Sequence, residues 1–331
     1  MLRTWMAMLT VLTLLCGCAG AEGFFSRSNY DQALAVVDGE VYCAGANVGL
    51  NFIPIYRIDD TGLKSVCARI GGWQSLYALD GKLLTVEPVL NLGEMLGSIP
   101  TSTYKAKLLN SATQKSSSLA SYVWNTEDGV CNVFAAQHKA YRDVCNGNQH
   151  TLERLDGDEW VAVAAWTGDD AWTYESYCVI GDRNENKPAY VALYEFATGK
   201  TYDVTTLMKR GTLTVLMEAV LEDGILYRLE ERGFFAINLT DGKREKLVSL
   251  PEKMETFILT DTQLILMSHQ HEQVWVLERD SWEIVRQVRM TEFPEYAALH
   301  AGKLYVYNPY DTAGVEVIDL ASGESAWYAL K

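Results

Sequence analysis

The feature that most constrains this chain is a repeated pattern of two short apolar strands joined by a tight turn. The pattern recurs about every 40 residues, which is the signature of a repeat architecture. In most units an aspartate followed by a glycine supplies the positive φ that a two-residue hairpin turn requires. These turns are Asp38-Gly39, Asp80-Gly81, Asp128-Gly129, Asp223-Gly224, Asp261-Thr262 and Ala301-Gly302. One interval is twice the usual length, and the segment 172–196, with a longer polar turn at 182–187, fills it as a seventh unit.

Each unit continues into a second hairpin, in which apolar and polar residues alternate around a Gly, Asp or Ser turn. Examples are YRIDDTGLKSVC in the first unit and FAINLTDGKREKLV in the fifth. This alternation is typical of half-buried antiparallel strands. The pattern predicts an all-β chain: a seven-bladed β-propeller of four-stranded antiparallel blades. Six or eight blades are the alternatives, because residues 129–190 align less well than the others.

Closure into a ring gives this prediction its physical basis. A single four-stranded blade has two apolar faces and cannot bury either of them alone. Blades stacked in a ring bury both faces and leave only short edges exposed. We therefore expect one propeller domain over residues 30–331.

The first residues predict where the protein is located in the cell and are not part of the predicted propeller. Arg3 precedes an apolar run over residues 4–15, which is too short to span a bilayer because a spanning helix needs about 20 residues. The segment Leu15-Cys16-Gly17-Cys18 resembles a bacterial lipobox, in which the last cysteine is lipidated. The alternatives are an ordinary signal peptide, cut after Ala19 or Ala21, and an uncleaved anchor.

The lipobox resemblance implies a lipoprotein signal peptide over residues 1–17 and a lipidated tether over residues 18–29. Lipid on Cys18 would hold the protein at the extracytoplasmic face of a bacterial cell membrane, because each buried CH₂ of an acyl chain contributes about 0.8 kcal/mol. The membrane is therefore one expected partner.

The charge of the chain excludes one class of partner. It carries 43 Asp and Glu against 28 Lys and Arg, for a formal net charge of −15. Such a surface repels phosphate backbones, so we expect no nucleic-acid partner. It also argues against an electrostatic attachment to anionic lipid. An unknown protein or glycan is the expected ligand.

Besides Cys16 and Cys18, the chain has five cysteines, and an odd number leaves at least one without a disulfide partner. They are Cys43, Cys67, Cys131, Cys145 and Cys178. Cys131 and Cys145 would face each other if VCNVFAAQ and AYRDVCNG form a hairpin that turns near His138; whether they are bonded stays open. The chain has no CxxC pair, and we predict no zinc or redox dithiol site.

Acidic and aromatic residues gather in the segment EWVAVAAWTGDDAWTYES. The candidate ligand-binding residues there are Trp166, Asp169, Asp170 and Trp172. Paired carboxylates can serve glycoside hydrolysis when their separation is right, and indole faces stack on sugars. Tryptophan and tyrosine are also common in strands for packing reasons alone. Both interpretations remain open at this point.

One loop has a weak resemblance to a calcium site. Asp182, Asn184 and Asn186 offer oxygen ligands at alternate positions. Lys187 replaces the glycine that makes the turn in such loops, and Leu193 stands where a bidentate glutamate belongs. A solvated loop is the alternative, and no other cofactor is predicted.

The last unit contains VIDLASGESAW, which is similar to the repeat of pyrroloquinoline-quinone-like propellers through Asp319, Ser322, Gly323 and Trp327. Glu195, Thr198 and Gly199 match the same repeat without its tryptophan. The chain also resembles the low-density-lipoprotein-receptor-type propeller domain of unknown function found on bacterial surface lipoproteins. Both resemblances imply a propeller and no specific activity.

No unit carries a coherent catalytic set, which favours a membrane-anchored extracytoplasmic binding or interaction module. One alternative is a carbohydrate-active hydrolase or lyase with its site at the mouth of the propeller channel. The other is a scaffold for the assembly of envelope proteins.

Overall fold

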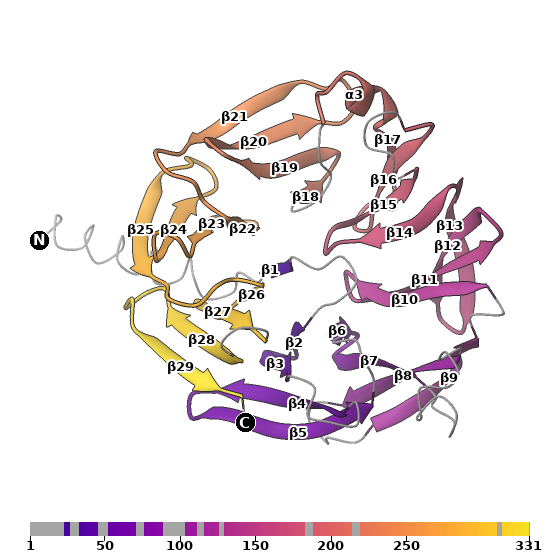
Figure 1. Ribbon diagram of the computed structural model, residues 1–331, viewed down its shortest axis with the longest axis horizontal. Helices are drawn as coiled ribbons and strands as arrows, with labels where there is room; N and C mark the ends of the chain where they lie inside the picture. The colour runs from indigo at the N-terminus through magenta and orange to yellow at the C-terminus, as the bar shows by residue number, and fades with distance from the viewer. Residues whose placement is uncertain are drawn as a thin grey trace, which may run out of the picture.

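The computed structural model is a closed ring of seven antiparallel blades around a central axis (Figure 1). It describes residues 23–26, 33–45, 52–70, 76–88, 103–110, 116–125, 129–182, 188–213, 219–309 and 313–330. The strands of each blade pair in chain order, and the first strand of each blade lies nearest the centre of the ring. The prediction of seven four-stranded blades is therefore confirmed.

The blades follow one another along the chain. The first contains β2 (Leu34–Val37), β3 (Glu40–Ala44), β4 (Phe52–Asp59) and β5 (Gly62–Ile70), and the second contains β6 (Leu76–Leu79), β7 (Lys82–Pro88), β8 (Thr103–Asn110) and β9 (Ser116–Asn125). The third contains β10 (Val130–Ala136), β11 (Lys139–Asn146), β12 (Gln149–Asp156) and β13 (Glu159–Thr167), and the fourth contains β14 (Asp169–Thr173), β15 (Tyr177–Gly181), β16 (Val191–Glu195) and β17 (Thr201–Asp203). The fifth contains β18 (Ala219–Glu222), β19 (Ile225–Glu230), β20 (Gly233–Asn238) and β21 (Arg244–Ser249). The sixth contains β22 (Thr256–Leu259), β23 (Gln263–Ser268), β24 (Gln273–Glu278) and β25 (Ile284–Arg289), and the seventh contains β26 (Tyr296–His300), β27 (Lys303–Asn308), β28 (Gly314–Asp319) and β29 (Ser325–Ala329).

Several of the predicted hairpin turns are present, with the backbone angles that such turns need. At Asp38-Gly39 and Asp223-Gly224 both turn residues have positive φ, between 47° and 76°. This is the geometry of a type I′ turn, whose twist matches that of the flanking strands. The sequence pattern and the backbone therefore agree at these positions.

Two turn assignments were wrong. Asp128-Gly129 does not join two strands of one blade, because β9 belongs to the second blade and β10 to the third. The first hairpin of the third blade instead turns at Gln137-His138, which have φ of 49° and 58°. The segment 182–187 lies between β15 and β16, so it belongs to the second connection of the fourth blade and not to its first. The hairpin near His138, on which the facing of Cys131 and Cys145 depended, is present.

The apolar core lies between the blades. One buried cluster includes Ile265 of the sixth blade and Val306 of the seventh, and another joins Tyr194 of the fourth blade to Phe134 of the third. Each blade therefore buries its faces against its two neighbours, as expected for blades that are stable only when stacked in a closed ring.

The ring closes between the seventh blade and the first by side-chain contacts. The buried Tyr307 hydroxyl donates to the Ala44 carbonyl, Lys303 forms an ion pair with Asp60, and the Tyr328 hydroxyl donates to the Asp60 carbonyl at 3.3 Å. These residues are more than 240 positions apart in sequence. We call this junction the seam.

One further strand, β1 (Gly23–Ser26), pairs antiparallel with β26 at the inner edge of the seventh blade. Figure 1 shows it near the centre of the ring. The strand lies within residues 18–29, the segment expected to be a tether, so the part of that segment that the structure describes is hydrogen-bonded to the propeller.

Within the described ranges there is one helix, α3 (Thr205–Lys209), between the fourth and fifth blades. No helix in the described part of the chain has the length and apolar character needed to cross a membrane.

Candidate functional site

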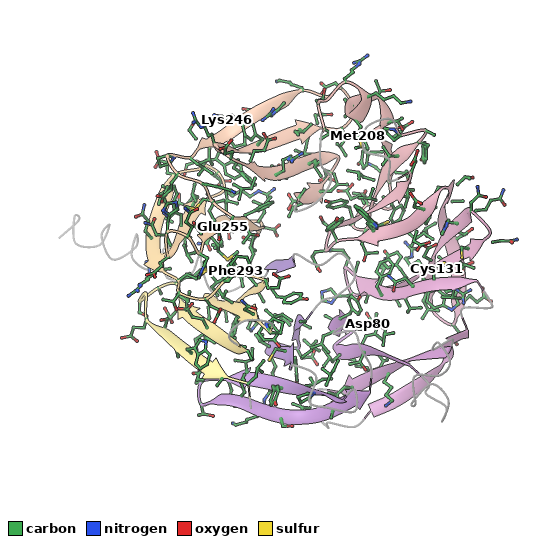
Figure 2. The ribbon with its side chains drawn as sticks, viewed as in Figure 1. Asp80, Cys131, Met208, Lys246, Glu255 and Phe293 are labelled. Atoms are coloured by element: carbon green, nitrogen blue, oxygen red, sulfur yellow. The ribbon has the colours of Figure 1, made fainter. Side chains whose placement is uncertain are left out.

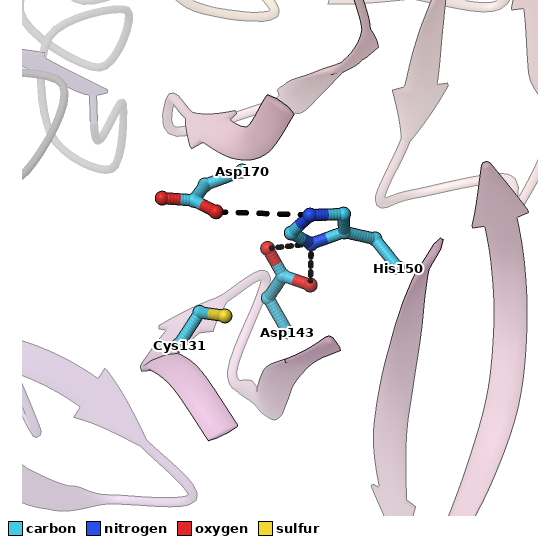
Figure 3. A group of neighbouring side chains, drawn as sticks. All are labelled: Cys131, Asp143, His150 and Asp170. Atoms are coloured by element: carbon cyan, nitrogen blue, oxygen red, sulfur yellow. Dashed lines mark hydrogen bonds and ion pairs between the residues drawn. The ribbon is translucent and has the colours of Figure 1, made fainter. Parts of the chain in front are cut away.

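Four side chains with metal-binding or catalytic chemistry meet where the third blade adjoins the fourth (Figure 3). They are Cys131 on β10, Asp143 on β11, His150 on β12 and Asp170 on β14. One sulfur, nitrogen or oxygen atom from each lies within 4.8 Å of those from the others. Figure 2 places Cys131 on the third blade. We call this group the interblade cluster.

Two irregularities in strand pairing bring the exposed members into the cluster. Cys131 falls in the register shift between Val130 and Asn132, and Asp170 falls in the shift between Asp169 and Trp172. A β-bulge inserts a residue and changes the direction of its side chain, and bulges are common beside functional sites. The sequence alternation alone therefore does not report where these two side chains point.

The lack of a side chain at Gly129 allows the backbone before β10 to approach β11 closely. The Gly129 carbonyl accepts a hydrogen bond of 2.6 Å from the Cys145 amide, and the φ of Gly129 is +81°. A Cβ at this position would lie 2.2 Å from the Cys145 carbonyl oxygen. Only glycine fits here without a shift of the backbone.

The centre of the cluster is a buried histidine–carboxylate pair. His150 Nδ1 lies 3.0 and 3.3 Å from the two oxygens of Asp143, and the tautomer with its hydrogen on Nδ1 donates to this carboxylate. Asp143 also accepts a 3.1 Å hydrogen bond from the Ala171 amide of the fourth blade. The residues Asp143 and His150 are only 1% and 4% exposed. Buried polar groups need partners of this kind, because each unsatisfied group costs about 1–3 kcal/mol.

Electrostatics at Asp143 reflect this environment. Burial raises the pKa of the Asp143 carboxyl, while the Ala171 amide and His150 oppose that rise by stabilising the charged form. Both of its oxygens have partners on the protein, one of them in the next blade. Asp143 therefore holds the His150 ring and ties the third blade to the fourth.

On the side away from Asp143, His150 faces the exposed carboxylate of Asp170. His150 Nε2 lies 3.7 Å from an oxygen of Asp170, whose side chain is 58% exposed. The Trp166 ring stacks on the His150 ring at a centroid distance of 5.2 Å, and its Nε1 donates to the Asp169 carbonyl at 2.8 Å. The ring of His150 is thus fixed on three sides, with Nε2 directed at Asp170.

Cys131 and Cys145 lie side by side across the β10–β11 hairpin. Their Sγ atoms are 2.7 Å apart, and Cys131 is exposed. Although the residue is exposed, its thiol is partly shielded from water, and this desolvation raises the pKa of Cys131; the hydrogen bond to Cys145 and the charge of Asp143 raise it further. This direction is opposite to that of nucleophilic cysteines, which have a lowered pKa.

The residues expected from the sequence are partly brought together here. Trp166 is buried and packs on His150, and Asp170 belongs to the cluster. Asp169 is exposed at the start of β14, and Trp172 is half-buried on the same strand. Asp143 and His150 were not among the expected residues. The pairing of neighbouring strands could have indicated them, because His150 lies directly opposite Cys145 on one side and Trp166 on the other.

Other expected residues lie elsewhere. Asp182 accepts a 3.0 Å hydrogen bond from the Ala189 amide, whereas Asn184 and Asn186 lie outside the described residues. Cys18 also lies outside them. Asp319 accepts hydrogen bonds of 2.8 Å from the amides of Ala321 and Ser322, so in the motif of the last unit this aspartate stabilises the turn between β28 and β29.

Among the comparisons with known proteins, one solved structure supports the fold. The sequence matches no protein-family model and no curated protein. Similar solved structures include a prolyl endopeptidase, at 12% identity and a TM-score of 0.53 over 96% of this chain and 49% of that chain. They also include the dihydro-heme d1 dehydrogenase NirN, at 13% identity and a TM-score of 0.46 over 93% of this chain and 72% of that chain. BamB from Moraxella catarrhalis matches at 12% identity and a TM-score of 0.44 over 89% of this chain and 84% of that chain. At such identities the likeness extends to the fold alone.

Proposed function

We propose that this protein is a lipid-anchored, extracytoplasmic propeller that binds a ligand or partner without catalysing a reaction. Its binding site is the interblade cluster. The observation that carries the proposal is the buried His150–Asp143 pair, which presents Nε2 to the exposed Asp170. Ligand sites use a small number of polar groups, held in place by the fold, to orient what they bind.

The state of the cluster favours binding over catalysis. A nucleophilic cysteine needs a neighbouring base and a lowered pKa. Partial shielding of the thiol from water, the hydrogen bond to Cys145 and the Asp143 charge instead raise the pKa of Cys131. Both Asp143 oxygens are engaged by His150 and by the Ala171 amide, so this carboxylate is committed to holding the site together.

The anchor follows from the lipobox resemblance and gives the propeller an orientation. Only residues 19–22 separate Cys18 from β1. From Cys18 to Gly23, a fully extended chain spans at most about 18 Å. With lipid on Cys18, the end of the ring at which β1 begins lies close to the bilayer and faces it.

Labelling with radioactive palmitate in a bacterial host tests the anchor. We expect the wild-type chain and Cys16→Ala to carry the label in the membrane fraction, and Cys18→Ala to carry none. Equal labelling of the Cys18→Ala variant, or no label on the wild type, would refute lipidation at this residue.

Glycan and peptide arrays test the binding role. We expect the full chain to retain a probe that Asp170→Asn retains at least ten times less well, with Asp169→Asn as the matched control. Conversion of a bound glycan to product, or equal retention by both variants, would contradict a non-catalytic site at the interblade cluster.

A further inference from the structure

The interblade cluster concentrates groups that become negative when they ionise. Cys131 supplies a sulfur, Asp143 and Asp170 supply carboxylates, and the donor atoms lie within 4.8 Å of one another. Like charges at such separations disfavour one another's ionised forms. A cation among them reverses this effect, because it stabilises each ionised ligand.

The orientation of His150 defines which nitrogen faces such a cation. Nδ1 is engaged by Asp143, which leaves Nε2 facing Asp170 at 3.7 Å. A carboxylate behind a histidine that presents its other nitrogen is the usual outer-shell arrangement of metal-binding histidines. Asp143 is therefore a positioning residue, while the donors on the exposed side are Cys131 and Asp170.

The chemistry of the donors selects the class of ion. One sulfur, one imidazole nitrogen and one carboxylate oxygen are ligands that Zn²⁺ accepts in tetrahedral sites, at about 2.0–2.3 Å. Calcium and magnesium prefer oxygen ligands only. Cys131 and Asp170 are exposed, which gives an ion a path of entry from solvent.

We propose that Cys131, His150 and Asp170 bind a divalent transition-metal ion, best matched by Zn²⁺, through Sγ, Nε2 and a carboxylate oxygen. Asp143 orients the His150 ring. The proposal rests on the proposed function and names the ligand class of the same site. Three protein ligands leave a fourth position open, so a donor from solvent or from a partner completes the coordination.

Cys145 makes the site sensitive to thiol oxidation. Its Sγ lies 2.7 Å from that of Cys131, so the same sulfur that binds the ion is placed to form a disulfide. With a small-molecule disulfide RSSR as oxidant, the two protein thiols become one Cys131–Cys145 disulfide. RSSR takes up their two protons and two electrons and leaves as two RSH. The metal-bound thiolate is unavailable to this exchange, so ion and disulfide exclude each other.

Cobalt titration of the full chain, reduced with a phosphine and freed of metal under argon, tests the metal site. Co²⁺ reports a thiolate ligand through a charge-transfer band in the near ultraviolet. We expect a 1:1 complex that Zn²⁺ displaces. Cys131→Ser should abolish the band, and Asp143→Asn should weaken Co²⁺ binding by about 10- to 100-fold.

Matched variants distinguish a metal site from a loss of folding. Cys67→Ser in the first blade and Asp169→Asn on β14 should leave the titration unchanged, and Cys145→Ser should keep the band. Circular dichroism checks each variant, and Cys131→Ser and Asp170→Asn change exposed side chains. The absence of a band in the folded wild type, or a band that survives Cys131→Ser, overturns the metal proposal.

Oxidised glutathione tests the competition. We expect the reduced protein to lose the mass of two hydrogens and its Co²⁺ binding, and prior Zn²⁺ to protect against both. Cys145→Ser should retain Co²⁺ binding under the same treatment. Equal Co²⁺ affinity of the oxidised and reduced wild type refutes the competition. Neither result affects the palmitate labelling, so failure here is distinguishable from failure of the anchor.

Discussion

Replacement of Tyr307 by phenylalanine tests whether the ring depends on a specific contact at its seam. Tyr307 on β27 is fully buried, and its hydroxyl donates to the Ala44 carbonyl of the first blade. The substitution keeps the aromatic ring, which lies 6.0 Å from the Tyr296 ring, and removes only the hydroxyl. Any loss of stability therefore reports the interactions of the hydroxyl and not the packing of the ring.

The expected magnitude follows from the burial of both partners. A net intramolecular hydrogen bond contributes about 0.5–1.5 kcal/mol, and a buried acceptor left without its donor costs about 1–3 kcal/mol. Because Tyr307 and Ala44 are both fully buried, we expect Tyr307→Phe to lower the free energy of unfolding by about 1–3 kcal/mol. The apolar cluster around the seam is unchanged by this substitution.

Urea unfolding monitored by tryptophan fluorescence measures the effect, with an unchanged slope against urea as the sign that only stability has changed. Tyr42→Phe is the matched control. Tyr42 is buried as well, and its hydroxyl donates to Glu40 at 2.7 Å within the first blade. The Glu40 carboxylate is half-exposed, so water can replace the lost donor and the loss should cost less than at the buried Ala44 carbonyl. A change below about 0.5 kcal/mol for Tyr307→Phe, as for an ordinary surface substitution, would show that the seam is held by apolar packing alone.

Three further predictions concern other parts of the molecule. In urea unfolding, Gly147→Ala should cost about 1–3 kcal/mol of backbone strain, because nothing lies within 4 Å of a Cβ at that position. Gly129→Ala should cost more, because its Cβ would lie 2.2 Å from the Cys145 carbonyl oxygen. Equal losses for the two variants would contradict this reasoning. Hydrogen bonds from the amides of its turn lower the pKa of Asp319, so its stabilising effect is present above the ordinary pKa of about 3.9 and is lost as pH falls through the folded value. The stability difference between wild type and Asp319→Asn should therefore shrink in acid, and a pH-independent difference in urea midpoints would refute the assignment. Burial raises the pKa of the Cys43 thiol, so mass spectrometry should find it unmodified by iodoacetamide until the protein is unfolded, and rapid labelling of the native chain would be the contrary result.

Much of the fold was predictable because its signals are local. Positive-φ turn residues such as Asp38-Gly39, together with period-two alternation, specify hairpins within one blade. The number of blades then follows from counting hairpins. The sequence was least informative at Asp128-Gly129, because a turn signal does not say whether the strands on its two sides pair with each other or belong to different blades.

The candidate site was predictable only in part, for a related reason. Trp166 and Asp170 were noticed for their residue types, and the facing of Cys131 and Cys145 followed from a single hairpin. The place of His150 in the site depends on Asp170, which comes from the next blade.

The sequence by itself therefore determined the strands, the hairpins and the repeat, because these depend on residues close together in the chain. Only the tertiary structure decided that two bulges direct Cys131 and Asp170 toward the His150–Asp143 pair, and that Tyr307 meets Ala44 at the seam. Contacts between blades form when a ring closes and brings distant segments together, and no local periodicity records which side chains then become neighbours.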